Sequence, residues 1–217
     1  MISTLFSSPI SFVFSILALL SALTIHELAH AWVADRLGDP TARLKGRISL
    51  NPLVHIDLSG LLFLLFFGFG WGKPVLIDPY NLKNPRKDTA IIALAGPLIN
   101  IILAIILSFF LRLSLTSNSL IIVDVLKIMI TTMIVYNIGL GIFNLVPIYP
   151  LDGFKIVGGL LPKEKAQEWQ GLERMGFFFL LALIFPIGSS SMLDYLIRPV
   201  MNFFYYLLIP ATGGGIV

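Results

Sequence analysis

The sequence predicts an all-α polytopic membrane protein with about five transmembrane helices, a re-entrant segment and a short surface β-hairpin. Of its 217 residues, 57% are hydrophobic and only 12% are charged, and its mean hydropathy is +0.91. A chain of this composition is too apolar to fold as an ordinary soluble domain. Its apolar residues gather in long runs, several of which reach the roughly 20 residues that a helix needs to cross a bilayer.

The composition also limits the kinds of site that the chain can carry. It has no cysteine, so a bound metal must use nitrogen and oxygen ligands, which favours a catalytic metal over a structural one. The net charge is only +3, and the basic residues lie beside apolar runs, where they set membrane orientation rather than bind nucleic acid. No positively charged region precedes the first apolar run, so we expect that run to remain as a helix and not to be cleaved as a signal peptide.

The first transmembrane helix is predicted over Pro9–Leu37, which is long enough to cross a bilayer core of about 30 Å. Gly38-Asp39-Pro40 provides its end. The next stretch, Thr41–Leu50, is polar, with apolar residues that partly alternate with polar ones. This alternation predicts a short hairpin at the surface.

The second apolar run, Leu58–Gly70, has only 13 residues. As a helix it would be about 20 Å long, which is too short to cross a bilayer comfortably. We therefore expect a re-entrant segment that returns to its own side of the membrane. Lys73–Asp88, which contains three prolines, is predicted to be a polar loop.

Later segments predict five more membrane-associated or spanning elements. Two long apolar stretches come first, the earlier of which carries Gly96-Pro97, a pair expected to kink or open the helix. A charged interfacial helix and two last spans follow. In order, these elements are predicted over Thr89–Leu113, Leu120–Val146, Lys155–Arg174, Leu172–Ile187 and Met192–Ile209.

The basic residues support this layout. If the first span ends in the cytosol and Leu58–Gly70 is re-entrant, every lysine and arginine is cytosolic except Arg112, Lys127 and Arg198. If Leu58–Gly70 were a true crossing, basic residues would fall on both faces and the usual cytosolic bias would disappear.

The most informative motif is His26-Glu27-Leu28-Ala29-His30, near the end of the first span. In a helix, histidines four residues apart lie on one face, so their nitrogens can share one tetrahedral metal ion. Glu27 is placed to take a proton from water at that metal. This pattern is the signature of zinc hydrolases. The alternative, two polar residues hydrogen-bonded at a helix end, is weaker because ionisable groups at membrane depth cost about 2–3 kcal/mol or more and usually mark function.

Zinc needs at least one further protein ligand, and His55 is the only other histidine, so we expect a carboxylate. The candidates beside the later apolar runs are Asp124, Asp152 and Asp194. Asp124 and Asp194 begin spans at the face opposite the motif histidines, whereas Asp152 follows the cytosolic end of the fourth apolar stretch. Depth therefore selects Asp152. Two prolines and a glycine surround it, and they interrupt the helix and allow its side chain to point inward.

These two motifs together resemble the site-2 protease family of intramembrane zinc metalloproteases, particularly its compact prokaryotic members. The resemblance rests on HELAH in one transmembrane helix and on Asn-Leu-Val-Pro-Ile-Tyr-Pro-Leu-Asp-Gly at 144–153. The stretches at 46–52 and 95–100 are also similar to the family, so the likeness covers residues 20–160 approximately. It implies hydrolysis of peptide bonds in or next to transmembrane segments of membrane-protein substrates, as in regulated intramembrane proteolysis.

The resemblance also implies roles for five residues. His26, His30 and Asp152 would bind zinc, one ion per chain, and Glu27 would be the general acid and base. Asn144 would help to hold the substrate carbonyl or the oxyanion. The chain departs from the family pattern in having no extra helix before HELAH, no PDZ-like insert, and phenylalanine at a position often held by glycine. These departures concern substrate selection more than chemistry.

We expect a single intramembrane metalloprotease domain over 1–217, with a catalytic core at about 9–160 and C-terminal helices at about 172–209. Its expected partners are the lipid bilayer and a transmembrane protein substrate, with no nucleic acid. The expected location is the cell membrane, with the active site toward the cytosol.

Two other functions and two other residues stay open at this point. A metal transporter would also use intramembrane His and Asp residues, but it does not explain Glu27 and would usually show an inverted repeat. A catalytically inactive membrane binding protein is disfavoured because every expected catalytic residue is present. His55 could be an alternative ligand or a loop residue, and Asn100 could bond the backbone near Pro97 or lie beside the site.

Overall fold

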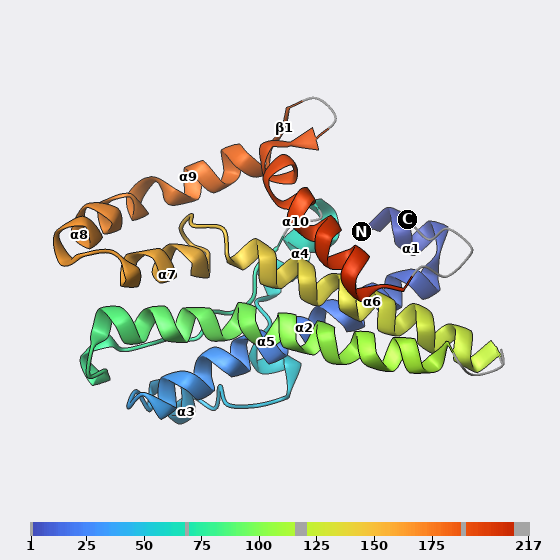
Figure 1. The fold of residues 1–217 in the computed structure, drawn as a ribbon, viewed down its shortest axis with the longest axis horizontal. Coiled ribbons are helices and arrows are strands. Elements are labelled where there is room, and N and C mark those ends of the chain that lie inside the picture. The colour runs from blue at the N-terminus through green and yellow to red at the C-terminus, as the bar shows by residue number, and fades with distance from the viewer. Residues whose placement is uncertain (1, 68–69, 116–120, 188–189, 211–217) are drawn as a thin grey trace.

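A computed structural model describes residues 2–67, 70–115, 121–187 and 190–210, and most of its elements are helices (Figure 1). In chain order the elements are α1 (Ile2–Ser7), α2 (Pro9–Arg36), α3 (Thr41–Leu44), η1 (Pro52–Val54), α4 (Leu58–Phe67), η2 (Pro79–Asn81), α5 (Pro85–Ser114), α6 (Ile121–Asn144), α7 (Asp152–Leu160), α8 (Lys163–Gly171), α9 (Glu173–Ile184), β1 (Pro186–Ile187), β2 (Ser190–Ser191) and α10 (Met192–Leu208).

Three long helices form the centre of the molecule. Within the described residues, α2, α5 and Val123–Asn144 of α6 are long and apolar enough to cross a membrane. The helix α5 packs against both α2 and α6, which also contact each other (Figure 1). The predicted all-helical, multi-pass membrane architecture is therefore confirmed in its main features.

The prediction of about five spans is not confirmed. The helices α9 and α10 have 12 and 17 residues, so at 1.5 Å per residue they are about 18 and 26 Å long, short of the roughly 30 Å hydrocarbon core. Two-residue strands β1 and β2 connect them. Pro186 and Ile187, which the sequence assigned to a spanning helix, thus lie in β1 and not in α9.

The first span was predicted over Pro9–Leu37 and is observed over Pro9–Arg36, because residues with strong backbone preferences lie at both of its ends. Pro9 at its first position lacks an amide hydrogen, and the first residue of a helix has no intrahelical partner for that hydrogen, so the helix loses no bond. Gly38, with φ of 110°, lies in a backbone conformation that ends the helix.

The predicted hairpin over Thr41–Leu50 is wrong. Residues Thr41–Leu44 form the helix α3, and no strand lies in this stretch. The buried carboxylate of Asp39 accepts hydrogen bonds from the backbone N–H and hydroxyl of Thr41, which favours a helical turn. Burial raises the pKa of Asp39, but hydrogen bonds from Thr41, Asp78 and Asn81 outweigh it and hold that pKa below its ordinary value.

The apolar helix α4 lies on a loop of chain that leaves and returns at one place. Ile56 and Gly72 form an antiparallel bridge, and the Lys73 N–H donates to the His55 carbonyl at 2.8 Å. With ten residues, α4 is too short to span a bilayer. This doubling back is the geometry that a re-entrant segment requires.

A buried arginine closes the base of this loop. The guanidinium of Arg47 donates to the carbonyls of Val54 and Lys73, one before α4 and one after it. The stretch that was expected to be a hairpin therefore supplies the side chain that joins the two ends of the α4 segment.

The helix α5 begins at Pro85, inside the stretch predicted as loop. Proline again occupies the first position, and the Asp88 carboxylate accepts the backbone N–H of Asn84 at 2.8 Å, which satisfies a donor at the helix start. The helix then continues through Pro97 without a break.

The chain leaves helical geometry between α6 and α7, as the two prolines predicted. The single interfacial helix expected over Lys155–Arg174 is instead divided, because Pro162 separates α7 from α8. Phe154, which departs from the family pattern, stacks on Trp169 at a centroid distance of 5.1 Å. This contact packs α8 against α7.

Candidate active site

The two motif histidines lie one turn apart on the same face of α2, as their spacing predicted. Both are buried, with 3% of His26 and 7% of His30 exposed. Their rings meet edge to face with centroids 4.6 Å apart. Because α2 is continuous here, the helix itself holds the two Nε2 atoms near one point.

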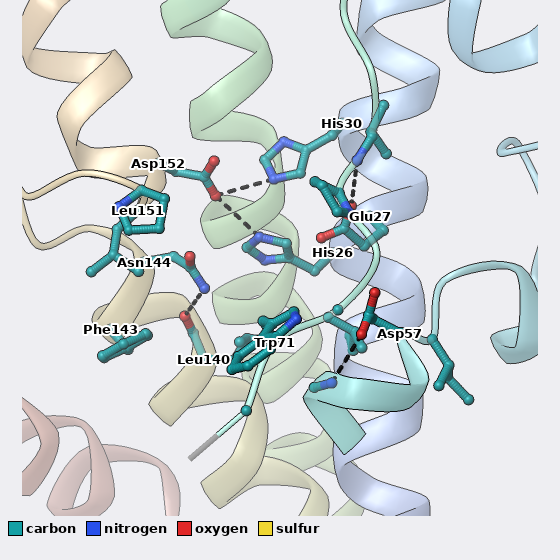
Figure 2. A pocket seen from close by; sticks show the side chains of 18 of the residues that line it. His26, Glu27, His30, Asp57, Trp71, Leu140, Phe143, Asn144, Leu151 and Asp152 are labelled. Atoms are coloured by element: carbon teal, nitrogen blue, oxygen red, sulfur yellow. Dashed lines mark hydrogen bonds and ion pairs between the residues drawn. The ribbon is translucent and has the colours of Figure 1, made fainter. Parts of the chain in front are cut away.

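Asp152 approaches these histidines from the first turn of α7 (Figure 2). Its Oδ2 atom lies 3.1 Å from the Nε2 of His26 and 3.1 Å from the Nε2 of His30. Gly153 makes this approach possible, because a Cβ there would lie 2.3 Å from the Leu145 carbonyl oxygen. Of the three late aspartates, Asp152 is the one that reaches the histidines, as the depth argument predicted.

The other two aspartates have local partners. Asp124 pairs with Lys127 at 3.3 Å, and Asp194 accepts the Ser191 N–H in the first turn of α10. His55 is buried against the Ser49 carbonyl and belongs to the loop before α4. Within the described residues, His26, His30 and Asp152 form the one group of three such side chains placed to share a metal.

The hydrogen-bond partner of each Nδ1 atom determines whether the Nε2 atom of the same imidazole carries a proton or a lone pair. The Nδ1 of His30 lies 2.7 Å from the Ile92 carbonyl, which can only accept, so Nδ1 carries the proton in the neutral ring. The Nδ1 of His26 lies 2.6 Å from Oδ1 of Asn100. In this tautomer both Nε2 atoms direct lone pairs toward a carboxylate oxygen, an arrangement of three acceptors that a bound metal ion would stabilise.

Gly96 of α5 forms the wall behind the imidazoles. A Cβ at this position would lie 2.5 Å from His30 Nε2 and 2.7 Å from His26 Cε1. Both rings therefore occupy the space that a side chain would fill. The sequence drew attention to Gly96 as a helix breaker, whereas its role in the structure is to admit the rings.

Two nitrogens and one oxygen are a donor set that suits zinc, and three protein ligands leave a fourth position open, as in catalytic zinc sites. In a tetrahedron with bonds of about 2.0–2.1 Å, ligand atoms lie about 3.3–3.4 Å apart. The separations of 3.1 Å from Asp152 to each histidine are close to that value. The residues present therefore fit the metal that the motif predicted.

Glu27 and Asn144 line the same cavity as the three candidate ligands (Figure 2). The cavity has a volume of about 370 Å³. Glu27 accepts the Val75 N–H at 3.1 Å, and Asn144, the last residue of α6, donates to the Leu140 carbonyl at 3.0 Å. All five residues singled out by the sequence thus meet around one space.

Sequence reasoning missed the residues that support the ligands from behind. It left Asn100 undecided, and the structure places that residue beside His26, with one N–H donated to the Ala22 carbonyl. It did not single out Asn137, although an asparagine inside an apolar helix is itself a signal.

Comparisons with known proteins agree with this geometry. The model of peptidase family M50 matches residues 14–126 and 113–183. Several similar curated proteins carry the name "putative zinc metalloprotease". YwhC of Bacillus subtilis is 35% identical over 195 residues, covering 86% of this chain and 85% of that protein. Rip2 of Mycobacterium tuberculosis (strain H37Rv) is 29% identical over 178 residues, covering 79% of this chain and 66% of that protein.

A more distant relative is zinc metalloprotease MJ0392 of Methanocaldococcus jannaschii, which is 25% identical over 146 residues, covering 66% of this chain and 33% of that protein. No solved structure matches the chain. The family match covers most of the chain, and the relative from Bacillus subtilis aligns over most of both sequences. The chain therefore belongs to peptidase family M50, the site-2 protease family, and is a membrane zinc metallopeptidase.

Proposed function

We propose that this protein is an intramembrane protease that hydrolyses peptide bonds in or next to transmembrane segments of membrane-protein substrates, as in regulated intramembrane proteolysis. It does so as a single domain with one zinc ion per chain. The observation that carries the proposal is the meeting of His26, His30 and Asp152 at one buried point, with Glu27 beside it. Because the histidines lie within the span α2, the bond to be cut must reach membrane depth.

His26, His30 and Asp152 are the proposed zinc ligands. When bound, zinc polarises a substrate carbonyl and lowers the pKa of a water molecule toward about 7. Glu27 is the proposed proton carrier. Its Oε2 is held by the Val75 N–H, which leaves Oε1 to take the proton of the attacking water and to return it to the leaving nitrogen.

Asn144 is proposed to stabilise the reacting carbonyl oxygen. One N–H of its side chain donates to the Leu140 carbonyl, and that bond orients the amide. The second N–H is then available to the oxyanion in the same cavity, an interaction that gains strength as negative charge develops.

The lining of the cavity supports an apolar, extended substrate. Besides the polar residues, the cavity is lined by apolar side chains of α2 and of the segment that carries α4. These are Leu19, Leu20, Leu23, Leu61, Leu64 and Trp71. A peptide bond within a helix is shielded by side chains and by its own hydrogen bonds, so we propose that the substrate segment unwinds before it reaches Glu27.

The ligand assignment is tested by zinc content. We expect wild-type protein to hold about one zinc ion per chain and His30→Ala and Asp152→Ala to lose both zinc and cleavage of a single-span membrane substrate, because each deletes one of three ligands. Asp124→Asn is the matched control, because Asp124 lies in the first turn of α6, where it pairs with Lys127, at the end of that helix opposite Asn144. This variant should keep its zinc. Full zinc content in Asp152→Ala would contradict the assignment.

The proposed orientation places the active site toward the cytosol of the cell membrane, with the base of the α4 loop and the start of α5 on that side. Because the chain has no cysteine, single cysteines can report this without background. Leu50→Cys and Asn84→Cys should both resist an impermeant thiol reagent in intact cells, whereas Leu115→Cys, after the far end of α5, should react. Labelling of only one of the first two would make Leu58–Gly70 a true crossing.

A further inference from the structure

A continuous line of buried polar side chains joins the three spanning helices behind the histidine pair. It begins at Asn137 of α6, passes through Asn100 of α5 and ends at His26 of α2. Asn100 and Asn137 are both 0% exposed. Buried amides in an apolar helix bundle cost free energy unless every polar atom is paired. The hydrogen bonds of these two asparagines therefore show what holds them in place.

The bonds leave each amide one possible orientation. The Nδ2 of Asn137 donates to the Met133 carbonyl at 2.8 Å, so its Oδ1 faces Asn100. The Nδ2 of Asn100 donates to that Oδ1 at 2.8 Å and to the Ala22 carbonyl at 3.0 Å. Since a carbonyl cannot donate, neither amide can be turned over without losing these bonds. The Oδ1 of Asn100 must therefore face His26.

The orientation matters because an amide, unlike a backbone carbonyl, has two faces of opposite character. His30 is paired with the Ile92 carbonyl, which always accepts. His26 is paired with a side chain, and a turned Asn100 would present its N–H groups to Nδ1. The His26 proton would then move to Nε2, the atom that lies 3.1 Å from Asp152, and the metal-binding lone pair would be lost.

We propose that Asn137 is a positioning residue that, together with the Ala22 carbonyl, holds Asn100 in one orientation. Through Asn100 it holds His26 in the tautomer with the proton on Nδ1 and the lone pair on Nε2. This inference rests on the proposed zinc site. It assigns α6 a part in metal binding although α6 supplies none of the three ligands. Replacement of outer partners of metal-bound histidines costs about 10–100-fold in metal affinity, and Asn137, one bond farther out, should cost about 10-fold.

The test reads the tautomer directly. The chain has only three histidines, so nitrogen NMR of metal-free, ¹⁵N-histidine-labelled protein in detergent can report the protonated nitrogen of each ring. In wild type we expect a proton on Nδ1 of both His26 and His30, the nitrogens that face Asn100 and the Ile92 carbonyl. This holds whether or not Nε2 also carries a proton opposite Asp152 in the metal-free protein. In Asn137→Leu, where Asn100 keeps only the Ala22 acceptor, a fraction of His26 should lose the Nδ1 proton while His30 stays unchanged. Zinc affinity measured against a chelator should fall about 10-fold.

Two further variants separate positioning from general packing. Asn137→Asp has the same shape, and in this fully buried position its protonated carboxyl can donate to the Met133 carbonyl and accept the Asn100 N–H. It should therefore restore the wild-type tautomer and most of the affinity. Thr132→Val removes another polar group of α6, a hydroxyl bonded to the Ile128 carbonyl, and should change neither.

The inference would be overturned by a His26 without a proton on Nδ1 in wild type, or by a wild-type Nδ1 proton and zinc affinity in Asn137→Leu. The NMR measurement in wild type needs neither metal nor the leucine variant, so a His26 without a proton on Nδ1 would overturn the inference even if Asn137→Leu does not fold. A wild-type protein that binds no zinc but shows the expected tautomer would refute the proposed function and leave the positioning role standing.

Discussion

Glu27→Gln is expected to retain about one zinc ion per chain and to show no detectable cleavage of a membrane-embedded substrate. Glutamine has the shape of glutamate and can keep an oxygen at the Val75 N–H, the bond that Glu27 makes at 3.1 Å. It cannot accept a proton from water. General acid–base catalysis alone contributes about 10²–10⁴ in rate, and Glu27 is proposed to act both as base and as acid.

The comparison must be made on one preparation, with zinc measured on the same samples as cleavage. His30→Ala is the contrasting variant, because it should lower zinc content and cleavage together. Equal processing by wild type and Glu27→Gln would refute the proposed mechanism even if the metal site is present. In a metal transporter the substitution would change metal flux, and neither protein would release a substrate fragment.

The parts of the site that the sequence predicted are those governed by local spacing or by depth. The side chains of His26 and His30 meet because a helix repeats every 3.6 residues, and any continuous helix gives that result. Asp152 lies more than a hundred residues away in the chain, yet the count of spans restricted which aspartate could arrive at the same depth. Membrane topology thus supplied a long-range constraint that a soluble protein would not offer.

The parts that the sequence did not predict depend on contacts between segments. The carboxylate of Asp39 accepts two hydrogen bonds from Thr41 and so favours the helix Thr41–Leu44. The weak alternation of apolar and polar residues in this stretch had suggested strands instead. Arg47 contributes through two carbonyls that lie on either side of α4. The role of Asn137 appears only when α5 and α6 are placed side by side. Such contacts leave no periodic trace in the sequence.

Gly96 shows how closely the ligands and their wall are fitted, and Gly96→Ala should reduce zinc affinity at least about 100-fold, the upper end of the effect of changes behind metal ligands. The added methyl group would lie 2.5 Å from His30 Nε2 and 2.7 Å from His26 Cε1, so both imidazoles must move. Metal ligands tolerate displacements of only about 0.2–0.5 Å. Cleavage should fall with the zinc.

Gly139→Ala is the matched control, because Gly139 also lies in a spanning helix and its added methyl would meet Met201 Cε at 3.7 Å, an ordinary contact. Both substitutions replace glycine by alanine inside a helix, which by itself favours the helix by about 0.5–1 kcal/mol. A loss of zinc confined to Gly96→Ala would therefore report the space that the imidazoles occupy and not the stability of the fold. If Gly96→Ala bound zinc as tightly as wild type, the two rings could not pack against α5 as described, and the arrangement of His26, His30 and Asp152 would have to be revised.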